Sequence, residues 1–206
     1  MKLLPLADRR ARPTDRQGGK ADGSPLLSIS SRRIRIRPTW PDDYPYLFSL
    51  ESHPRLGFRW SSDRRVPTYE LFVERMRLDP AREFVAVAAD GRPVGWLEAY
   101  NEDASSGYAW IGVFMDPSVQ GSGLGIEAIA VFIHYLFVSL PYRKLYANAI
   151  EESYRSFASG DGRFFHVEGR LREHEFYNGS FRDRLTLAVY RDEWREIMRV
   201  WGPRLG

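Results

Sequence analysis

Strict alternation of polar and apolar residues marks the start of the structured part of the chain. Residues 33–37 read RIRIR, and this period of two predicts a half-buried β-strand. A proline-containing break follows at residues 38–41, after which Asp42 or Asp43 can cap a first helix. A second helix is predicted over residues 68–80, because its apolar residues recur at spacings of three and four.

The remaining pattern predicts a mixed β-sheet. Asp90-Gly91 and Asn178-Gly179 are hairpin signals, so the strands on either side of each turn should be antiparallel neighbours. An amphipathic helix separates strand 108–115 from strand 144–150, and a parallel arrangement of these two strands is therefore expected. Strands are predicted at residues 84–88, 94–100, 108–115, 144–150, 170–177 and 181–190.

A glycine-rich turn joins strand 108–115 to the helix that follows it. Its sequence is Gln120-Gly121-Ser122-Gly123-Leu124-Gly125. Glycines let successive backbone N–H groups point outward together, and a helix start adds unsatisfied N–H groups and the positive end of its dipole. The turn therefore predicts a site for an anion such as a pyrophosphate.

Other glycine motifs fit this turn less well. A Walker loop ends in Gly-Lys-Ser/Thr, whereas Gly125 is followed by Ile126 and Glu127. A dinucleotide-binding fingerprint needs G-x-G-x-x-G, and the run here is G-x-G-x-G. A plain strand-to-helix turn without a ligand remains the alternative.

Composition limits the class of protein without naming a function. The chain has 206 residues, no cysteine and a net charge of +3, which suits one folded domain without disulfides or thiolate zinc sites. No apolar run approaches the ~20 residues that span a bilayer. We therefore expect a cytoplasmic protein without membrane contact.

Residues 1–30 are basic and show no helical or strand periodicity. We expect a flexible tail there, either an electrostatic arm or an unselected extension.

The glycine turn resembles the acyl-CoA-binding signature of the GCN5-related N-acetyltransferase (GNAT) family, Q/R-x-x-G-x-G/A. Gln120, Gly123 and Gly125 occupy the signature positions, and Met115-Asp116-Pro117 resembles the family's strand exit before the loop. Residues 168–194 look like the branch that includes ribosomal-protein N-terminal acetyltransferases. The resemblance extends from about residue 33 to residue 195.

The resemblance implies an α/β (α+β) fold: a mixed, mostly antiparallel sheet of six or seven strands flanked by three or four helices. In this family a central parallel pair splays apart, and the pantetheine arm of CoA enters the gap. That pair corresponds here to strands 108–115 and 144–150. We expect the domain to span residues 31–197, between the tail 1–30 and a C-terminal tail 198–206.

The implied co-substrate is acetyl-CoA or another acyl-CoA, and no metal is expected. Gln120 has two interpretations, a polar contact to a phosphate or a side chain that holds the loop's own shape. The expected cofactor-binding residues are Phe114, Met115, Gln120, Gly121, Ser122, Gly123, Leu124, Gly125 and Ser153.

Attack of an amine on a thioester requires a group that removes a proton from the amine. Glu98, Glu102 and Asp103 are candidates, and Glu98 is preferred because it lies between apolar residues; a solvent-facing charge is the alternative reading of Glu98. Many family members have an Asn and then a Tyr after the parallel strand. Here Ser153 takes the Asn place and no Tyr takes the usual place, which leaves Ser153 and Tyr154 as candidate acids.

Several acceptors and donors remain open at this point. The acceptor amine can be a protein N-terminus, or a small molecule held near the aromatic loop Phe58-Arg59-Trp60. The donor group can instead sit on a carrier protein or a tRNA, although other nucleic-acid contact is not expected. A non-catalytic module that binds acyl-CoA or a partner is a further alternative. A homodimer is plausible from the family alone.

Overall fold

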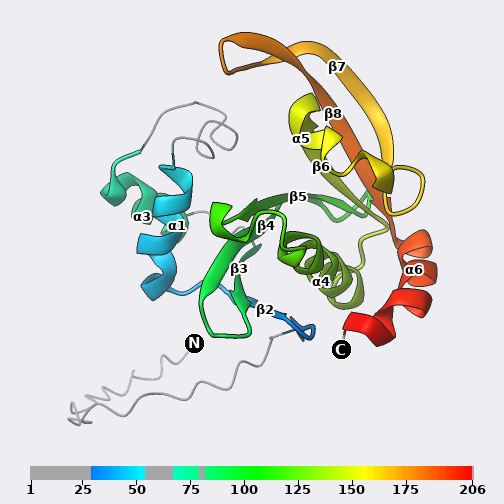
Figure 1. The fold of residues 1–206 in the computed structure, drawn as a ribbon, viewed down its shortest axis with the longest axis horizontal. Helices are drawn as coiled ribbons and strands as arrows, with labels where there is room; N and C mark the ends of the chain where they lie inside the picture. The colour runs from blue at the N-terminus through cyan, green and yellow to red at the C-terminus, as the bar shows by residue number, and fades with distance from the viewer. Residues whose placement is uncertain (1–28, 54–66, 79–81, 206) are drawn as a thin grey trace, which may run out of the picture.

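The computed structural model describes residues 29–53, 67–78 and 82–205. Within these residues a single sheet of eight strands runs through the molecule, with helices on both faces (Figure 1). The strand order is β1-β2-β3-β4-β5-β6-β8-β7, and β5–β6 is the parallel pair in this otherwise antiparallel sheet. The expected mixed α/β architecture is confirmed.

The elements follow the sequence predictions closely. The strands are β1 (Ile29–Ser30), β2 (Ile34–Pro38), β3 (Arg82–Ala88), β4 (Pro93–Asp103), β5 (Tyr108–Met115), β6 (Lys144–Ile150), β7 (His166–Tyr177) and β8 (Ser180–Tyr190). The helices among the described residues are α1 (Tyr44–Glu51), α3 (Tyr69–Leu78), α4 (Leu124–Ser139), α5 (Glu151–Arg155) and α6 (Arg191–Leu205). The sheet gains β1, whose residues 29 and 30 were assigned to the flexible tail, because they pair with residues 35 and 36 of β2.

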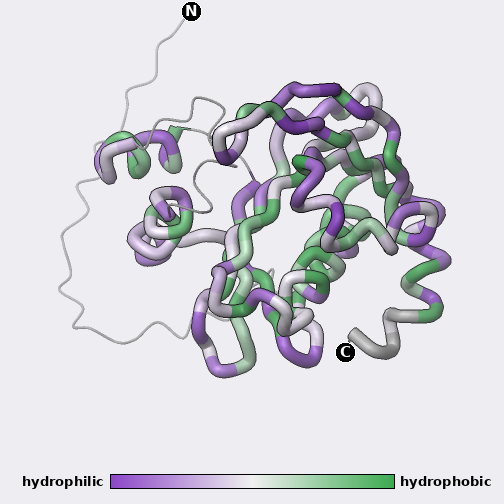
Figure 2. The backbone as a smooth tube through the Cα atoms, turned by 45° about the horizontal axis from the view of Figure 1, so that its top comes forward, coloured by the Kyte–Doolittle hydropathy of each residue, from purple (hydrophilic) through white to green (hydrophobic). Residues whose placement is uncertain are grey.

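One face of the sheet is covered by α4. Ile34 and Ile36 of β2, the apolar positions of the alternating segment, are fully buried beneath it, as are Leu97 and Ala109 nearer the centre of the sheet. Apolar segments gather at the strands and helix in the middle of the molecule, and hydrophilic ones lie in the outer loops (Figure 2). This core holds the position of α4, and with it the glycine turn at its N-terminus.

The opposite face of β3, β4 and β5 is covered by α1 and α3. Phe72 of α3 is completely buried and meets Trp96 of β4 edge-on at 6.2 Å between ring centroids. Glu51 of α1 is also buried, and its carboxylate pairs with the guanidinium of Arg75 in α3 at 2.6 Å. The apolar cluster that these two helices form with the sheet includes no residue of β6 or β8. The helices α1 and α3 therefore cover only the β3–β5 part of this face.

The helix α6 is the main departure from the predicted elements. Residues 198–206 were expected to form a C-terminal tail, whereas α6 continues to Leu205. The reason is tertiary: Trp194 is buried, and Ile197 and Met198 pack with it against the core under α4. Residues 1–28 of the expected tail and the loop Phe58-Arg59-Trp60 lie outside the described residues.

Arg191, the first residue of α6, closes the far end of α4. Its guanidinium donates hydrogen bonds to the carbonyl oxygens of Phe137, Leu140 and Tyr142, at and just beyond the last turn of α4. A cation there satisfies orphan carbonyls and complements the negative end of the helix dipole. Arg191 therefore fixes α4 at the end opposite the glycine turn.

We expect Arg191→Met to lower the free energy of unfolding by about 2–3 kcal/mol, because three carbonyls lose a charged donor. Urea denaturation followed by circular dichroism measures this loss. Arg195→Met is the matched control: Arg195 is an exposed arginine of the same helix whose one ion pair among the described residues is with Asp192, at 3.0 Å. Its loss should cost less than about 0.5 kcal/mol. Equal losses in both variants would contradict the capping role.

Candidate active site

The parallel strands β5 and β6 run together briefly and then separate. They pair at Tyr108–Lys144, Ala109–Leu145 and Trp110–Tyr146, and their pairing stops there. Beyond this point β5 stays bonded to β4 and β6 stays bonded to β8. The two strands therefore form a fork that opens toward their C-terminal ends, where the glycine turn follows β5 and α5 follows β6.

Aromatic rings mark the closed end of the fork. The rings of Trp110 and Tyr146, the last paired residues, stack at 5.0 Å between centroids with 25° between their planes. Tyr108 meets Tyr146 edge-on at 5.6 Å. Since Ala109 and Leu145 are buried under α4, the side chains of Tyr108, Trp110 and Tyr146 lie on the other face of the sheet. That face thus presents a half-buried aromatic surface where the strands part.

The glycine turn has the backbone geometry of an anion cradle. Gly121 and Gly123 adopt φ of +77° and +79°, values that favour glycine. Among the described groups, no acceptor takes the N–H of Gly121, Gly123 or Gly125. A Cβ at Gly121 would meet nothing within 4 Å, so the space in front of the turn is open. Three free donors beside a helix N-terminus can bind a pyrophosphate.

Gly125 brings the cradle against the open arm of β5. A Cβ at this position would come within 3.1 Å of Met115 Cγ, a contact tighter than side chains normally make. The structure thus places the cradle next to Phe114 and Met115, the predicted backbone contacts of the pantetheine arm. Phe114 itself is buried under α1 and α3, so any contact from it to a ligand would come from the main chain.

Two polar side chains of the turn have different environments. The Ser122 hydroxyl donates to the Val119 carbonyl at 2.6 Å and accepts from the Leu124 N–H at 3.2 Å, so it holds the shape of the turn. The exposed Gln120 side chain makes no hydrogen bond to any described residue. Of the two interpretations of Gln120, this placement favours a contact to a ligand.

The three candidate bases differ in their contacts. Glu102 pairs with Arg82 at 2.7 Å on the surface. Hydrogen bonds from Ser105 and Ser106 lower the pKa of Asp103 to about 2, which makes it a poor proton acceptor at neutral pH.

Glu98 is the remaining candidate, and it is half-buried on the face opposite α4. Its strand neighbours are Glu83 of β3 and Gly112 of β5, within the arm of β5 that no longer pairs with β6. Burial and then the Glu98 carboxylate raise the pKa of the nearby Tyr100. Glu98 therefore lies one strand from the fork, on the face of the aromatic surface.

The short helix α5 carries Ser153 and Tyr154 on the other arm of the fork. The Tyr154 hydroxyl donates to Asp161 at 3.2 Å, and its ring packs edge-on against Phe157 and Phe165. Desolvation and the bond to Asp161 raise the pKa of Tyr154. The half-buried Ser153 hydroxyl makes no hydrogen bond to a described residue, which leaves it the freer proton donor.

Ion pairs hold α5 against the β7–β8 hairpin. Glu152 pairs with Arg182 of β8 at 2.7 Å, and Glu151 lies 3.7 Å from Arg170 of β7. The position of Ser153 therefore depends on the hairpin as well as on β6.

A fork beside a glycine cradle is the arrangement that the GNAT resemblance implied, and comparison with known proteins agrees. Residues 33–158 match the family model for the acetyltransferase (GNAT) domain. The chain belongs to the GNAT acetyltransferase family. This GNAT protein is accordingly an acyltransferase that moves an acyl group from acyl-CoA to an amine.

The similar proteins include spermidine N-acetyltransferases. Spermidine N(1)-acetyltransferase of Escherichia coli (strain K12) is 25% identical over 182 residues, covering 85% of this chain and 96% of that protein. The crystal structure of spermidine N-acetyltransferase from Vibrio cholerae in complex with CoA and spermine superposes with a TM-score of 0.70. It is 20% identical and covers 79% of this chain and 98% of that one, which shows the same fold. These relatives support the GNAT family without specifically supporting the ribosomal-protein branch.

The described residues contain no candidate metal centre. Within residues 29–53, 67–78 and 82–205 there is no group of three or more His, Asp and Glu side chains that could hold an ion. A spermidine/spermine N-acetyltransferase structure from Vibrio cholerae contains manganese ions, with a TM-score of 0.65 and 21% identity over 80% of this chain and 96% of that one. The absence of a metal cofactor therefore stays an expectation.

No described helix is long and apolar enough to cross a bilayer.

Sequence reasoning missed two features of this site. The stacked pair of Trp110 and Tyr146 joins residues 36 positions apart, and only the strand register brings them together. Arg33 was predicted only as the first residue of a half-buried strand, yet its guanidinium reaches Ser122 and Glu127 beside the cradle. No local pattern signals either contact.

We expect Ser153→Ala to lower kcat by roughly tenfold or more, because it removes the free hydroxyl at the open end of β6. Tyr154→Phe should leave kcat within about twofold, since its hydroxyl is engaged with Asp161. Steady-state kinetics with acetyl-CoA and a saturating amine measure both. A large loss in Tyr154→Phe with none in Ser153→Ala would make Tyr154 the proton donor.

Proposed function

We propose that this GNAT protein acetylates a primary amine of a small cationic acceptor, with acetyl-CoA as donor. The observation that carries this proposal is the fork between β5 and β6, with a cradle of free N–H groups at its mouth. Gly121, Gly123 and Gly125 would bind the CoA pyrophosphate, and Gln120 would contact a phosphate. The open edge of β5 at Phe114 and Met115 would bind the amides of the pantetheine arm.

The reaction then follows from the residues on either arm of the fork. Glu98 accepts a proton from the acceptor ammonium, directly or through a water, so that the amine nitrogen can attack the thioester carbon. Backbone N–H groups on the open edge of β5 stabilise the oxyanion that forms. As the carbon–sulfur bond breaks, Ser153 donates a proton to the leaving thiolate. The products are the amide and free CoA.

The aromatic surface supports a cationic acceptor. Trp110 and Tyr146 lie at the closed end of the fork, on the face where the Glu98 carboxylate also lies. Aromatic ring faces and carboxylates together attract alkylammonium groups. The relatives named for spermidine point to the same chemistry, and a polyamine is accordingly the favoured acceptor. A protein N-terminus, which the hairpin region suggested, is the competing acceptor.

The cradle is tested by calorimetric titration of acetyl-CoA into the parent and into Gly123→Trp. A Cβ at Gly123 would lie 3.5 Å from Nη2 of Arg33, and the residue would have to adopt a positive φ that side chains rarely take. A Trp there should therefore distort the turn, and we expect binding to fall at least about a hundredfold. Gly179→Trp is the matched control, because Gly179 has the same φ of +79° and lies in the distant β7–β8 turn. Acetyl-CoA should bind this variant as it binds the parent.

The acceptor is tested in the same preparation by turnover with spermidine, spermine and a short peptide with a free N-terminus. The proposal expects the polyamines to give the higher kcat/KM. Preference for the peptide would move the acceptor to a protein N-terminus. No acetyl-CoA binding to the parent would overturn acetyl-CoA as donor and favour a carrier-bound or tRNA-bound acyl group.

The role of Glu98 is tested by the pH dependence of Glu98→Gln. We expect kcat to fall about a hundredfold near pH 7, because the acceptor is then almost entirely protonated and has lost its base. The deficit should shrink as the pH rises toward the amine's own pKa near 10, where free amine is abundant. Glu102→Gln on the same strand is the control and should stay within about twofold of the parent. A deficit that does not change with pH would exclude Glu98 as the base.

A further inference from the structure

The segment around β1 and β2 makes polar contacts with the first turn of α4. The Nε of Arg33 donates to Oε2 of Glu127 at 2.7 Å, and its Nη2 lies 2.6 Å from the same oxygen. The backbone N–H of Arg33 donates to Oε1 at 3.1 Å, and the hydroxyl of Ser31 donates to that oxygen as well. Arg33 also donates through Nη1 to the Ser122 carbonyl at 3.2 Å. We call this group of residues, Ser31, Arg33, Ser122 and Glu127, the cradle clamp.

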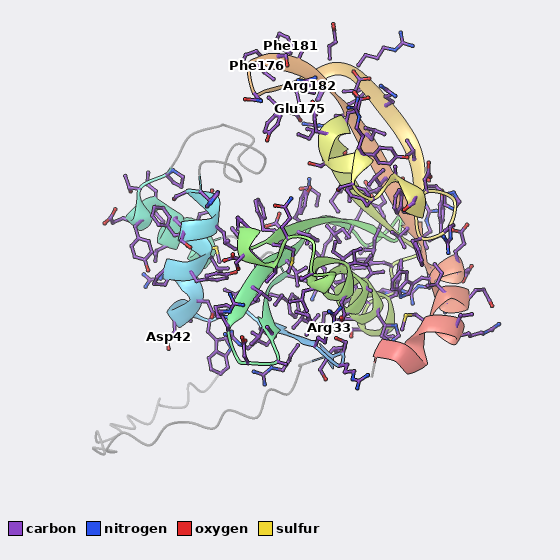
Figure 3. All side chains as sticks on the ribbon, in the orientation of Figure 1. Arg33, Asp42, Glu175, Phe176, Phe181 and Arg182 are labelled. Atoms are coloured by element: carbon purple, nitrogen blue, oxygen red, sulfur yellow. The ribbon has the colours of Figure 1, made fainter. Side chains whose placement is uncertain are left out.

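The cradle clamp lies directly against the glycine turn. Glu127 is in the first turn of α4, and its own N–H donates to the Gly123 carbonyl at 3.2 Å. The Nη2 of Arg33 is 3.5 Å from the position of a Cβ on Gly123. Figure 3 labels Arg33 at the edge of the sheet beside the β2 and α4 ribbons. The clamp therefore contacts the loop whose N–H groups are free.

A carboxylate in this position conflicts with anion binding unless it is paired. Burial raises the pKa of Glu127, but the hydrogen bonds from Ser31 and Arg33 outweigh burial and lower it, so the group is ionised at neutral pH. Its side chain is only 11% exposed, so solvent screens its charge poorly. Without Arg33, the Glu127 charge would stand uncompensated in the first turn of α4, next to the glycine turn, and the Ser122 carbonyl would lose its donor.

We propose that Arg33 is a positioning residue for acyl-CoA binding, which holds the glycine turn in its open shape and neutralises Glu127 beside the phosphate site. Arg33 acts through Glu127 and Ser122 and needs no contact with CoA itself. The inference rests on the proposed function, since it takes the glycine turn as the phosphate cradle.

The test compares KM for acetyl-CoA and kcat in Arg33→Met, Glu127→Gln and the double variant. Arg33→Met should raise KM by roughly tenfold and leave kcat within about twofold, because only cofactor binding is disturbed. The double variant should recover most of this loss, since removal of the Glu127 charge also removes the repulsion. Arg33→Lys, which keeps the charge but not the forked contact, should fall between the parent and Arg33→Met.

Arg35→Met is the matched control for charge alone. Arg35 is an exposed arginine of β2, two residues from Arg33, and makes no ion pair with any described residue. Its loss should leave KM within about twofold of the parent. An equal rise in Arg35→Met and Arg33→Met would overturn the clamp and indicate long-range attraction of CoA.

Dephospho-acetyl-CoA distinguishes the clamp from a direct phosphate contact. The clamp predicts the same relative rise in KM for acetyl-CoA and for dephospho-acetyl-CoA. A rise confined to acetyl-CoA, without recovery in the double variant, would mean that Arg33 binds the 3′-phosphate and would overturn the positioning role. If Arg33→Met fails to fold, KM for acetyl-CoA is compared between the parent, Arg33→Lys and Glu127→Gln instead. An unchanged KM in Arg33→Lys then overturns the inference.

Failure of this inference can be separated from failure of the proposed function. Loss of acetyl-CoA binding in Gly123→Trp with an unchanged KM in Arg33→Met would overturn the positioning role of Arg33 and leave the glycine turn as the CoA site. Normal binding in Gly123→Trp would overturn both proposals.

Discussion

The separation of β5 from β6 is the constraint on which the rest of this protein depends. Each strand keeps its antiparallel neighbour to its end, β5 with β4 up to Met115 and β6 with β8 up to Ile150. The two halves of a twisted sheet therefore diverge where the parallel pairing ends. Gly95 supports the β4 side, because a Cβ there would come within 2.7 Å of the Phe114 carbonyl oxygen. The gap places the open edge of β5 beside the start of α4, and the proposed thioester transfer uses both.

The helix α4 is fixed at both ends by arginines, under opposite electrostatic conditions. Arg191 lies at the C-terminal end, where a cation complements the dipole and binds orphan carbonyls. Arg33 lies at the N-terminal end, where a cation alone would be unfavourable, and there Glu127 stands between it and the helix. The pair leaves the first turn near neutral and its N–H groups available. The same helix thus has its C-terminal carbonyls bound by a cation, while the glycine N–H groups at its N-terminus have no acceptor among the described residues.

The proposed chemistry depends on environment more than on residue type. Three carboxylates, Glu98, Glu102 and Asp103, follow one another closely in the chain, and contacts alone separate them. Hydrogen bonds lower the pKa of Asp103, Glu102 pairs with Arg82 on the surface, and Glu98 lies half-buried next to the open arm of β5. Likewise, Asp161 engages Tyr154, and the adjacent Ser153 hydroxyl stays free of described partners. Polyamine chemistry would suit the face on which Glu98 and the stacked rings of Trp110 and Tyr146 lie.

The sequence by itself determined the elements whose signals are local. Alternation over residues 33–37, hairpin turns such as Asn178-Gly179 and the glycine run at 121–125 each depend on a few neighbouring residues, and each was found where it was predicted. Tertiary structure alone decided the contacts between distant residues. Arg33 and Glu127 are 94 positions apart, and α6 is held by the packing of Trp194 and by the carbonyls that Arg191 binds. Backbone conformation and amphipathic period are determined by residues close together in the sequence. Side-chain partners depend on how the sheet brings distant segments together.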